Sequence, residues 1–172
     1  MGKRLTTLLS RPQPLLASHA LADFDCDESS LNDWLKRRAL QNQISGATRT
    51  FVVVKEGRVC AYYALASSAV APAATSGRFR RNMPDPIPVV VLARLAVHRE
   101  YQGQGLGRAL FQDAALRVIH AADAIGIRGL LVHALSDKAK RFYEQLGLQA
   151  SPLDPLVLMT TVAGLKVALA NP

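Results

Sequence analysis

The sequence predicts an α/β protein in which helices flank a mixed β-sheet, within a single domain over residues 1–172. Three observations lead to this prediction. Residues 48–70 have the pattern of a β-hairpin, residues 89–97 form an almost continuous apolar run typical of a strand covered on both faces, and helical patterns follow between later strands. A chain of 172 residues, 49% of them hydrophobic and 20% charged, is large enough for a packed core.

The first predicted helix covers residues 31–42 and follows a stretch of acids and serines that suits a helix start. Leu31, Trp34, Leu35 and Ala39 recur at helical spacing, so we expect them to form its buried stripe. The basic residues beside this stripe are expected to point largely to water.

The later segments have strand and helix patterns in turn. The hairpin turns at residues 56–58, and residues 71–88, with four prolines, predict an exposed loop. The remaining predicted elements are a strand at 89–97, a helix that ends near Ala124, a strand at 128–135, a helix at 136–148 and a last strand at 154–162.

Composition limits the kind of partner and compartment. The formal net charge of +8 favours an acidic partner such as nucleic acid, a phosphorylated cofactor or an anionic protein. Cys26 and Cys60 form no C-x-x-C motif and the four histidines lack metal-ligand spacing, so no metal site is predicted. No apolar run approaches the roughly 18 residues of a spanning helix. Prolines and Arg11 interrupt the apolar N-terminal patch, which argues against a signal peptide. We therefore expect no membrane association and a cytoplasmic, reducing location.

Glycines at alternate positions, Gly103, Gly105 and Gly107, stand between the apolar strand and the next helix. Glycine allows close approach to the main chain, and the N–H groups of a first helical turn suit an anion. A Rossmann motif fails because Arg108 replaces its last glycine, and a P-loop lacks its Gly-Lys-Ser/Thr. Gln-x-x-Gly-x-Gly remains, and by itself it is also compatible with a tight turn and close strand–helix packing.

The order of four stretches, "VLARLAV", "HREYQGQGLGRAL", "RGLLVHAL" and "SDKAKRFYEQLGL", resembles the GNAT acetyltransferase superfamily. The resemblance covers most of the chain. It implies the GNAT fold and acetyl-CoA as cofactor, with its pyrophosphate on the backbone of the glycine loop and its pantetheine arm along the preceding strand. Tyr143 matches the general acid that protonates the departing thiolate; the alternative is an ordinary core aromatic. The implied cofactor-binding residues are Leu95, Ala96, Val97, Gln102, Gly103, Gln104, Gly105, Leu106, Gly107, Arg108, Ser136 and Lys138.

Longer blocks of the same sequence, residues 31–70, 89–118 and 130–159, resemble acetyltransferase toxins of bacterial toxin–antitoxin pairs. Such toxins acetylate the α-amino group of amino acids carried on tRNA and so block translation. The resemblance implies an aminoacyl-tRNA substrate, a ribbon-helix-helix antitoxin encoded nearby and a homodimer. Ala61 and His98 depart from it, because many relatives have glycine and an acidic residue there. Acetylation of a small-molecule or protein amine, and a non-catalytic acetyl-CoA-binding or nucleic-acid-binding module, remain as alternatives.

Acid–base chemistry favours an α-amino substrate. A lysine with a pKa of about 10.4 is neutral in only about four molecules per ten thousand at pH 7, whereas an α-amine near ~7.8 is neutral in about one in eight. The expected tRNA phosphate contacts are Lys36, Arg37, Arg38, Arg78, Arg80 and Arg81. Arg94 interrupts an apolar strand, so it is expected either to place the substrate or to anchor the core.

Overall fold

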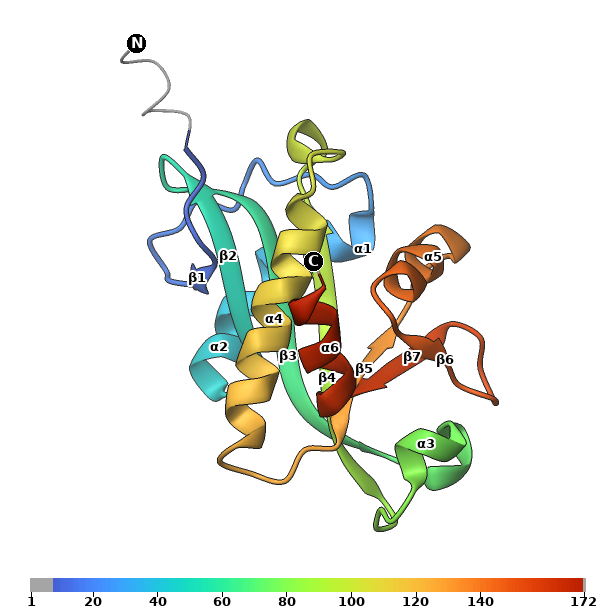
Figure 1. Ribbon diagram of the computed structural model, residues 1–172. Helices are drawn as coiled ribbons and strands as arrows, with labels where there is room; N and C mark the ends of the chain where they lie inside the picture. Colours follow the sequence, from blue (N-terminus) through green and yellow to red (C-terminus); the bar gives the residue numbers. More distant parts are fainter. Residues whose placement is uncertain (1–7, 172) are drawn as a thin grey trace. The chain divides into compact units, whose positions relative to one another are not determined.

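A computed structural model describes residues 8–171, which divide into two compact units that are interleaved along the chain. The first unit comprises the residues up to Ala66 together with Arg94–Asp113, and the second comprises Ser67–Ala93 and the residues from Ala114 onward. Figure 1 labels their elements. A single domain over residues 1–172 stays a prediction, and residues 1–7 and 172 lie outside the described part.

Seven strands form one mixed sheet, with the order β1-β2-β3-β4-β5-β7-β6. Strands β4 and β5 pair in parallel, whereas the β1–β2, β2–β3, β5–β7 and β6–β7 pairs are antiparallel. The predicted mixed sheet is therefore confirmed. The strands are β1 (Gln13–Pro14), β2 (Arg49–Lys55), β3 (Arg58–Val70), β4 (Ile87–Val97), β5 (Gly129–His133), β6 (Gln149–Ala150) and β7 (Val157–Thr161).

The helices begin with a continuous segment over residues 29–45, whose middle part is π-helical. It confirms the predicted first helix and extends it at both ends. Within residues 8–171, no helix is both long and apolar enough to cross a membrane. The helical elements are α1 (Ser29–Trp34), η2 (Leu35–Ala39), α2 (Leu40–Ser45), η3 (Pro72–Ala74), α3 (Gly77–Arg80), η4 (Arg99–Tyr101), α4 (Leu106–Ala122), α5 (Asp137–Gln145) and α6 (Val162–Ala170).

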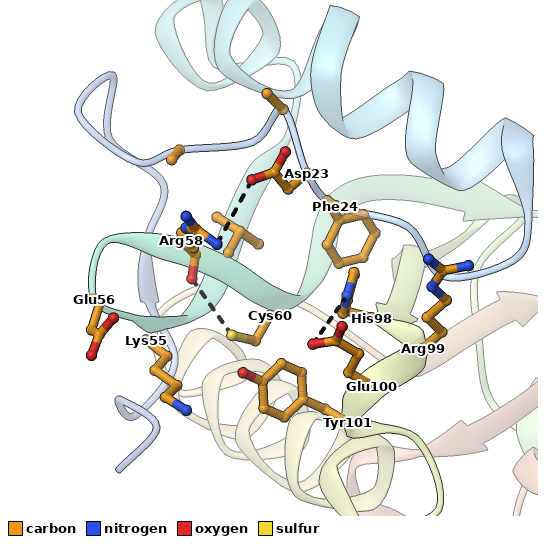
Figure 2. A pocket seen from close by; sticks show the side chains of 13 residues that line it. Asp23, Phe24, Lys55, Glu56, Arg58, Cys60, His98, Arg99, Glu100 and Tyr101 are labelled. Atoms are coloured by element: carbon orange, nitrogen blue, oxygen red, sulfur yellow. Dashed lines mark hydrogen bonds and ion pairs between the residues drawn. The ribbon is translucent and has the colours of Figure 1, made fainter. Parts of the chain in front are cut away.

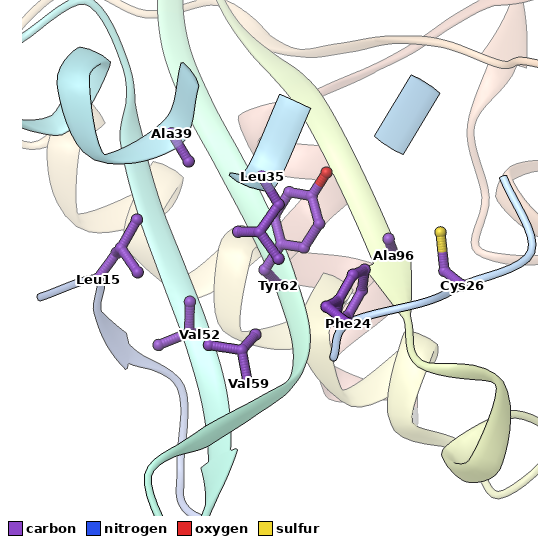
Figure 3. Close-up of a cluster of buried hydrophobic side chains, with 9 residues drawn as sticks. All are labelled: Leu15, Phe24, Cys26, Leu35, Ala39, Val52, Val59, Tyr62 and Ala96. Carbon is purple, nitrogen blue, oxygen red and sulfur yellow. The ribbon is translucent and has the colours of Figure 1, made fainter. Parts of the chain in front are cut away.

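The core of the first unit gathers around Tyr62 on β3, as Figure 3 shows. Leu35 and Ala39 are fully buried in this core, and Leu31 and Trp34 pack against it half-buried, which confirms the predicted stripe. The Tyr62 hydroxyl donates a hydrogen bond to the Leu31 carbonyl at 2.7 Å, so the buried phenol is satisfied.

The second unit has its own apolar cluster, and this cluster corrects one prediction. Phe79, only 2% exposed, packs with Ile87, Val89, Leu131 and Met159. Residues 71–88 are therefore not simply an exposed loop: they contain η3 and α3, and β4 already begins within them. The proline- and arginine-rich composition of this segment predicts a loop. The segment nevertheless folds onto the core, because burial of the Phe79 ring removes a large apolar surface from water.

The C-terminal part of the chain differs from the predicted strand at 154–162. Strand β7 covers Val157–Thr161 only, and the chain continues as α6. The Thr161 hydroxyl accepts a hydrogen bond from the Gly164 amide at 3.0 Å and so caps this helix. The predicted helix at 136–148 is confirmed as α5.

Candidate functional site

The glycine loop opens α4 in the first unit. Gly103 and Gly105 have φ angles of 76° and 82°, which favour glycine over any other residue. A Cβ at either position would meet no atom within 4 Å, and residues 102–105 are exposed. The N–H groups of the first turn, which includes Gly107, have no helical acceptors. The loop thus leaves main-chain donors and the positive end of a 17-residue helix open to an anion.

Gln102 holds this loop by its side chain. Its Nε2 donates to the Val97 carbonyl at 2.8 Å and to the Cys26 carbonyl at 3.1 Å. Because both bonds go to the protein, a contact of Gln102 with a cofactor would involve its main chain rather than its amide nitrogen. The bond to Val97 fixes the loop to the end of β4.

Strand β4 continues beyond its pairing with β5. The parallel register runs from Val89 opposite Gly129 to Leu92 opposite Val132, and β4 itself extends to Val97. The predicted residues Leu95, Ala96 and Val97 lie in this extension. Main-chain groups without a β5 partner can instead pair with an extended ligand.

Tyr143 lies in the second unit, near the end of α5. Its side chain is 6% exposed, and its ring packs edge-on against Phe142 at 5.0 Å between centroids. Burial raises the pKa of the Tyr143 phenol above its ordinary value, because the phenolate would lose its hydration. The phenol is therefore fully protonated at neutral pH and able to act as an acid.

Helix α5 begins with two further predicted residues, Ser136 and Lys138. The Ser136 hydroxyl accepts a hydrogen bond from the Ala139 amide at 3.1 Å and caps the helix. Both residues are exposed. Ser136 thus has a structural task, whether or not it also contacts a cofactor.

Comparison with known proteins places the glycine loop in a family. Residues 46–149 match the family model described as acetyltransferase (GNAT) domain. The chain belongs to the GNAT acetyltransferases. The predicted fold class and enzyme class are thereby confirmed.

The GNAT chain is also similar to toxins. It is 50% identical over 162 residues to a tRNA-acetylating toxin of Mycobacterium tuberculosis (strain ATCC 25618 / H37Rv). The aligned region covers 94% of this chain and 98% of that toxin. The structure of AtaT complexed with acetyl-methionyl-tRNAfMet is similar with a TM-score of 0.86 and 31% identity, over 93% of this chain and 98% of AtaT. A tyrosine-to-phenylalanine mutant of AtaT, bound to the C-terminus of the antitoxin AtaR and to acetyl-CoA, gives 0.81 and 29%, over 95% and 99%.

The basic residues predicted to contact tRNA fall in both units of the GNAT chain. Lys36, Arg37 and Arg38 are consecutive and exposed on the π-helical segment η2 in the first unit. The other three, Arg78, Arg80 and Arg81, are exposed in the second unit, on α3 or directly after it.

Arg94 is half-buried on β4 in the first unit. Its guanidinium lies over the indole of Trp34, 5.2 Å from the ring centroid, and Trp34 stacks on Tyr62 at 5.9 Å. This contact anchors the arginine to the helix that carries Trp34. A role of Arg94 toward substrate stays a prediction.

The sequence did not reveal a cavity of about 420 Å³ beside the chain segment that leads into the glycine loop. Figure 2 shows residues from three separate chain segments around it, including Phe24, Arg58 and Tyr101. Its charges pair across the wall: an Arg58 nitrogen lies 3.8 Å from an Asp23 oxygen. No single sign of charge dominates the lining, so the cavity is a poor match for a phosphate group.

His98, one of the two departures from the toxin pattern, lines the same cavity and joins two distant segments. Its Nδ1 accepts a hydrogen bond from the Asp25 amide at 3.0 Å, and the Arg99 amide donates to the Asp25 carbonyl at 2.9 Å. Because Gln102 bonds Cys26 in the same segment, residues 25 and 26 brace the entry to the glycine loop. Such a contact over more than 70 residues leaves no local signal in the sequence.

Proposed function

We propose that this GNAT acetyltransferase transfers the acetyl group of acetyl-CoA to the α-amino group of an amino acid carried on tRNA, and thereby blocks translation. The observation that carries the proposal is the open glycine loop fixed by Gln102 to the end of β4, beside a stretch of β4 that has no β5 partner. An anion followed by an extended chain fits this arrangement.

The residues of the glycine loop and of the end of β4 fit acetyl-CoA, which would supply the acetyl group as a thioester. In the proposal, the main-chain amides from Gln102 to Arg108 bind the pyrophosphate, with the exposed side chain of Arg108 adding positive charge. The main chain of Leu95 and Val97 pairs with the pantetheine arm. Ala96 contributes main chain only, because its side chain is buried in the core.

The protein's chemical task is the movement of protons around this acyl transfer. A bond forms between the α-nitrogen and the acetyl carbon while the carbon–sulfur bond breaks, and the nitrogen releases a proton to water. The Tyr143 hydroxyl, kept protonated by burial, donates a proton to the leaving sulfur and regains one from water, so that no net proton is consumed. The α-amine needs little help from a base, because about one in eight is already neutral at pH 7.

The tRNA part of the proposal draws its support from relatives and from charge. A relative 50% identical to this chain is a tRNA-acetylating toxin, and AtaT, which has a similar structure, has been seen with acetyl-methionyl-tRNAfMet. The net charge of +8 and the exposed basic residues of both units suit a polyanion.

The proposed protein partners are also inferred from relatives. AtaT has been seen with the C-terminus of its antitoxin AtaR. We propose that this toxin is likewise neutralised by an antitoxin, of the ribbon-helix-helix class and encoded next to it, and that it works as a homodimer in the cytoplasm, where charged tRNA is available. Co-purification with the product of the adjacent reading frame tests the antitoxin. Measurement of the molecular mass in solution by light scattering tests the homodimer.

The decisive experiment traces the acetyl group. The purified protein is incubated with acetyl-labelled acetyl-CoA and charged tRNA, and the tRNA is then digested to nucleosides. Label on the aminoacyl-adenosine from the 3′ end supports the proposal. Label on free polyamines or on protein, with none on tRNA, would support the alternative acetyltransferase, and no release of CoA thiol with any amine would contradict both.

A further inference from the structure

The segment between β3 and β4 places its arginines on a helix too short to be stable by itself. Helix α3 has four residues, whereas isolated helices below about 12 residues are marginal in water. Arg78, Arg80 and Arg81 also repel one another at this spacing. Contacts from outside the helix must therefore hold it.

Arg128, the residue directly before β5, provides such contacts. Its Nε donates to the Phe79 carbonyl at 2.7 Å and its Nη2 donates to the Arg78 carbonyl at 2.7 Å. Carbonyls at the end of a helix lack helical partners, and a guanidinium fork can satisfy two at once. The same guanidinium lies over the Phe79 ring, 5.9 Å from its centroid. One side chain thus fixes both the main chain and the buried ring of α3.

The backbone of Arg128 is itself fixed from two sides. Its amide donates to the Pro88 carbonyl at 2.8 Å, and its carbonyl accepts from the Val162 amide at 3.0 Å. The next residue, Gly129, packs so closely on Thr160 that a Cβ would overlap the Thr160 carbonyl. The guanidinium therefore starts from a rigid base, and its two hydrogen bonds determine where α3 lies in the second unit.

The arginines of this segment have different tasks. Arg80 donates through Nη1 to the carbonyl of the buried Thr75 at 2.9 Å, so it stabilises the segment itself. The exposed guanidiniums of Arg78 and Arg81 make no hydrogen bond or ion pair within residues 8–171. In that same range, no carboxylate forms an ion pair with Arg80 or Arg128 either. Uncompensated cations held this close together favour binding of a polyanion.

We propose that Arg128 is a positioning residue for RNA binding: it clamps the carbonyls of Arg78 and Phe79 and thereby presents the guanidiniums of Arg78 and Arg81 to the phosphodiester backbone of tRNA. This inference rests on the proposed function, because it takes tRNA to be the substrate. Arg128 itself does not touch the RNA. Its charge is used inside the protein, and its effect on binding passes through its two neighbours.

The test uses the full chain and deacylated bulk tRNA as the probe. Arg128→Lys keeps the positive charge but cannot donate to both carbonyls in the same geometry. We expect the Kd for tRNA to rise about tenfold and the slope of log Kd against log salt to fall, since each lost phosphate contact removes about 0.9 from that slope. Arg58→Gln, which removes an exposed charge of the first unit, serves as the control and should change neither by more than about twofold.

A double-mutant cycle separates positioning from other roles. In a background of Arg78→Gln with Arg81→Gln, the additional change Arg128→Lys should have no effect on the tRNA Kd. An undiminished effect in that background would overturn the proposal, because Arg128 would then contact the RNA or act through the fold. Unchanged tRNA affinity and salt slope in the Arg128→Lys single variant would overturn it as well.

Two controls separate an effect on RNA binding from an effect on folding and from a failure of the proposed function. The acetyl-CoA Kd of each variant, measured by calorimetry, reports on folding, and Arg128→Gln with a normal acetyl-CoA Kd replaces the lysine variant if that one does not fold. Acetylation of charged tRNA by the unchanged protein tests the proposed function separately. A protein that binds tRNA through this clamp but acetylates another amine would disprove the function and leave the clamp intact.

Discussion

The side-chain amide of Gln102 donates a hydrogen bond to the carbonyl oxygen of Val97 at 2.8 Å, and so joins the glycine loop to the last residue of β4. The loop and the strand end are thereby held as one unit before any ligand arrives. Preorganisation of this kind reduces the ordering cost of binding. The glutamine of the Gln-x-x-Gly-x-Gly motif thus has a structural reason, independent of any contact with a cofactor.

Gln102→Ala should weaken acetyl-CoA binding about tenfold, because it removes two hydrogen bonds that each contribute about 0.5–1.5 kcal/mol. Calorimetry of the purified variant measures the change. Gln104→Ala is the matched control, since the amide nitrogen of Gln104 makes one long bond of 3.4 Å to the Glu100 carbonyl. Equal Kd values for the two variants would show that the Gln102 side chain does not position the loop.

Gly105→Asp should abolish acetyl-CoA binding. The substitution places a carboxylate in the open space where we expect the pyrophosphate, and like charges repel. Gly57→Asp is a suitable control, because Gly57 has a similar φ of 78° and a Cβ there would also meet nothing within 4 Å. Both variants carry the same backbone strain, so a loss of binding that is confined to Gly105→Asp identifies the anion site. Normal affinity in a folded Gly105→Asp protein would refute that site.

Tyr143→Phe should lower the rate of acetyl transfer to charged tRNA by about 10²–10⁴-fold while the acetyl-CoA Kd stays within about twofold. The exchange removes one hydroxyl and keeps the ring that packs against Phe142. Expression of the unchanged protein alone should arrest growth, and the variant should relieve the arrest. If Tyr143 were only a core aromatic, the variant would shift the melting temperature and leave turnover nearly intact.

The buried tyrosines should make the protein lose stability in alkali. Burial raises the pKa of Tyr143 and of Tyr62, so above pH ~10 the unfolded chain releases protons that the folded chain retains. Stability from these groups is complete below about pH 10 and falls above it, by about 1.4 kcal/mol per pH unit for each tyrosine. Denaturant titrations between pH 9 and about pH 11 should show a shallower fall for Tyr143→Phe than for the unchanged protein, and identical slopes would contradict the burial of the phenol.

The basic stretch on η2 should contribute to RNA binding through charge alone. Replacing Lys36, Arg37 and Arg38 together by glutamine should weaken tRNA binding and lower its salt slope, with the acetyl-CoA Kd unchanged. The buried neighbours Leu35 and Ala39 are not altered, so the helix should remain. A control that replaces Arg11, Lys55 and Arg58 removes the same charge from the same unit. If both triple variants bind tRNA equally well, the stretch is solvated charge without a specific role.

Much of this fold could be predicted from the local sequence, because β3 and β4 are apolar runs and α4 and α5 are helical segments bounded by glycines or caps. Helix α6 was missed because "VAGLKVALA" is apolar apart from Lys166 and so lacks an amphipathic pattern, and because its cap, Thr161, also ends a strand. Helix α3 was missed because its local contacts, the Ser76 cap and the bond from Arg80 to Thr75, are few. The burial of Phe79 and the hydrogen bonds from Arg128 also stabilise it, and both depend on distant parts of the chain.

The candidate site likewise contains features that the local sequence predicts and features that depend on distant contacts. The glycine loop has a local cause, positive φ angles and a helix start, and its sequence motif could therefore be recognised. The division of tasks among Arg78, Arg80 and Arg81 has no signal in the sequence, since it depends on the Thr75 carbonyl and on Arg128, which lies 50 positions after Arg78. The brace from Asp25 and His98 likewise arises only in the folded chain.

The interleaving of the two units has a consequence for how the protein is made. The chain passes from one unit to the other within β3, within β4 and within α4, so each crossing interrupts a continuous element. A ribosome must have released residues up to Asp113 before the first unit is complete, and the second unit requires nearly all that follows. A nascent or truncated chain that ends before Asp113 therefore contains no finished unit. Because Tyr143 lies in the unit that is completed last, a cell that synthesises the enzyme is not exposed to its activity until translation of that chain is almost over.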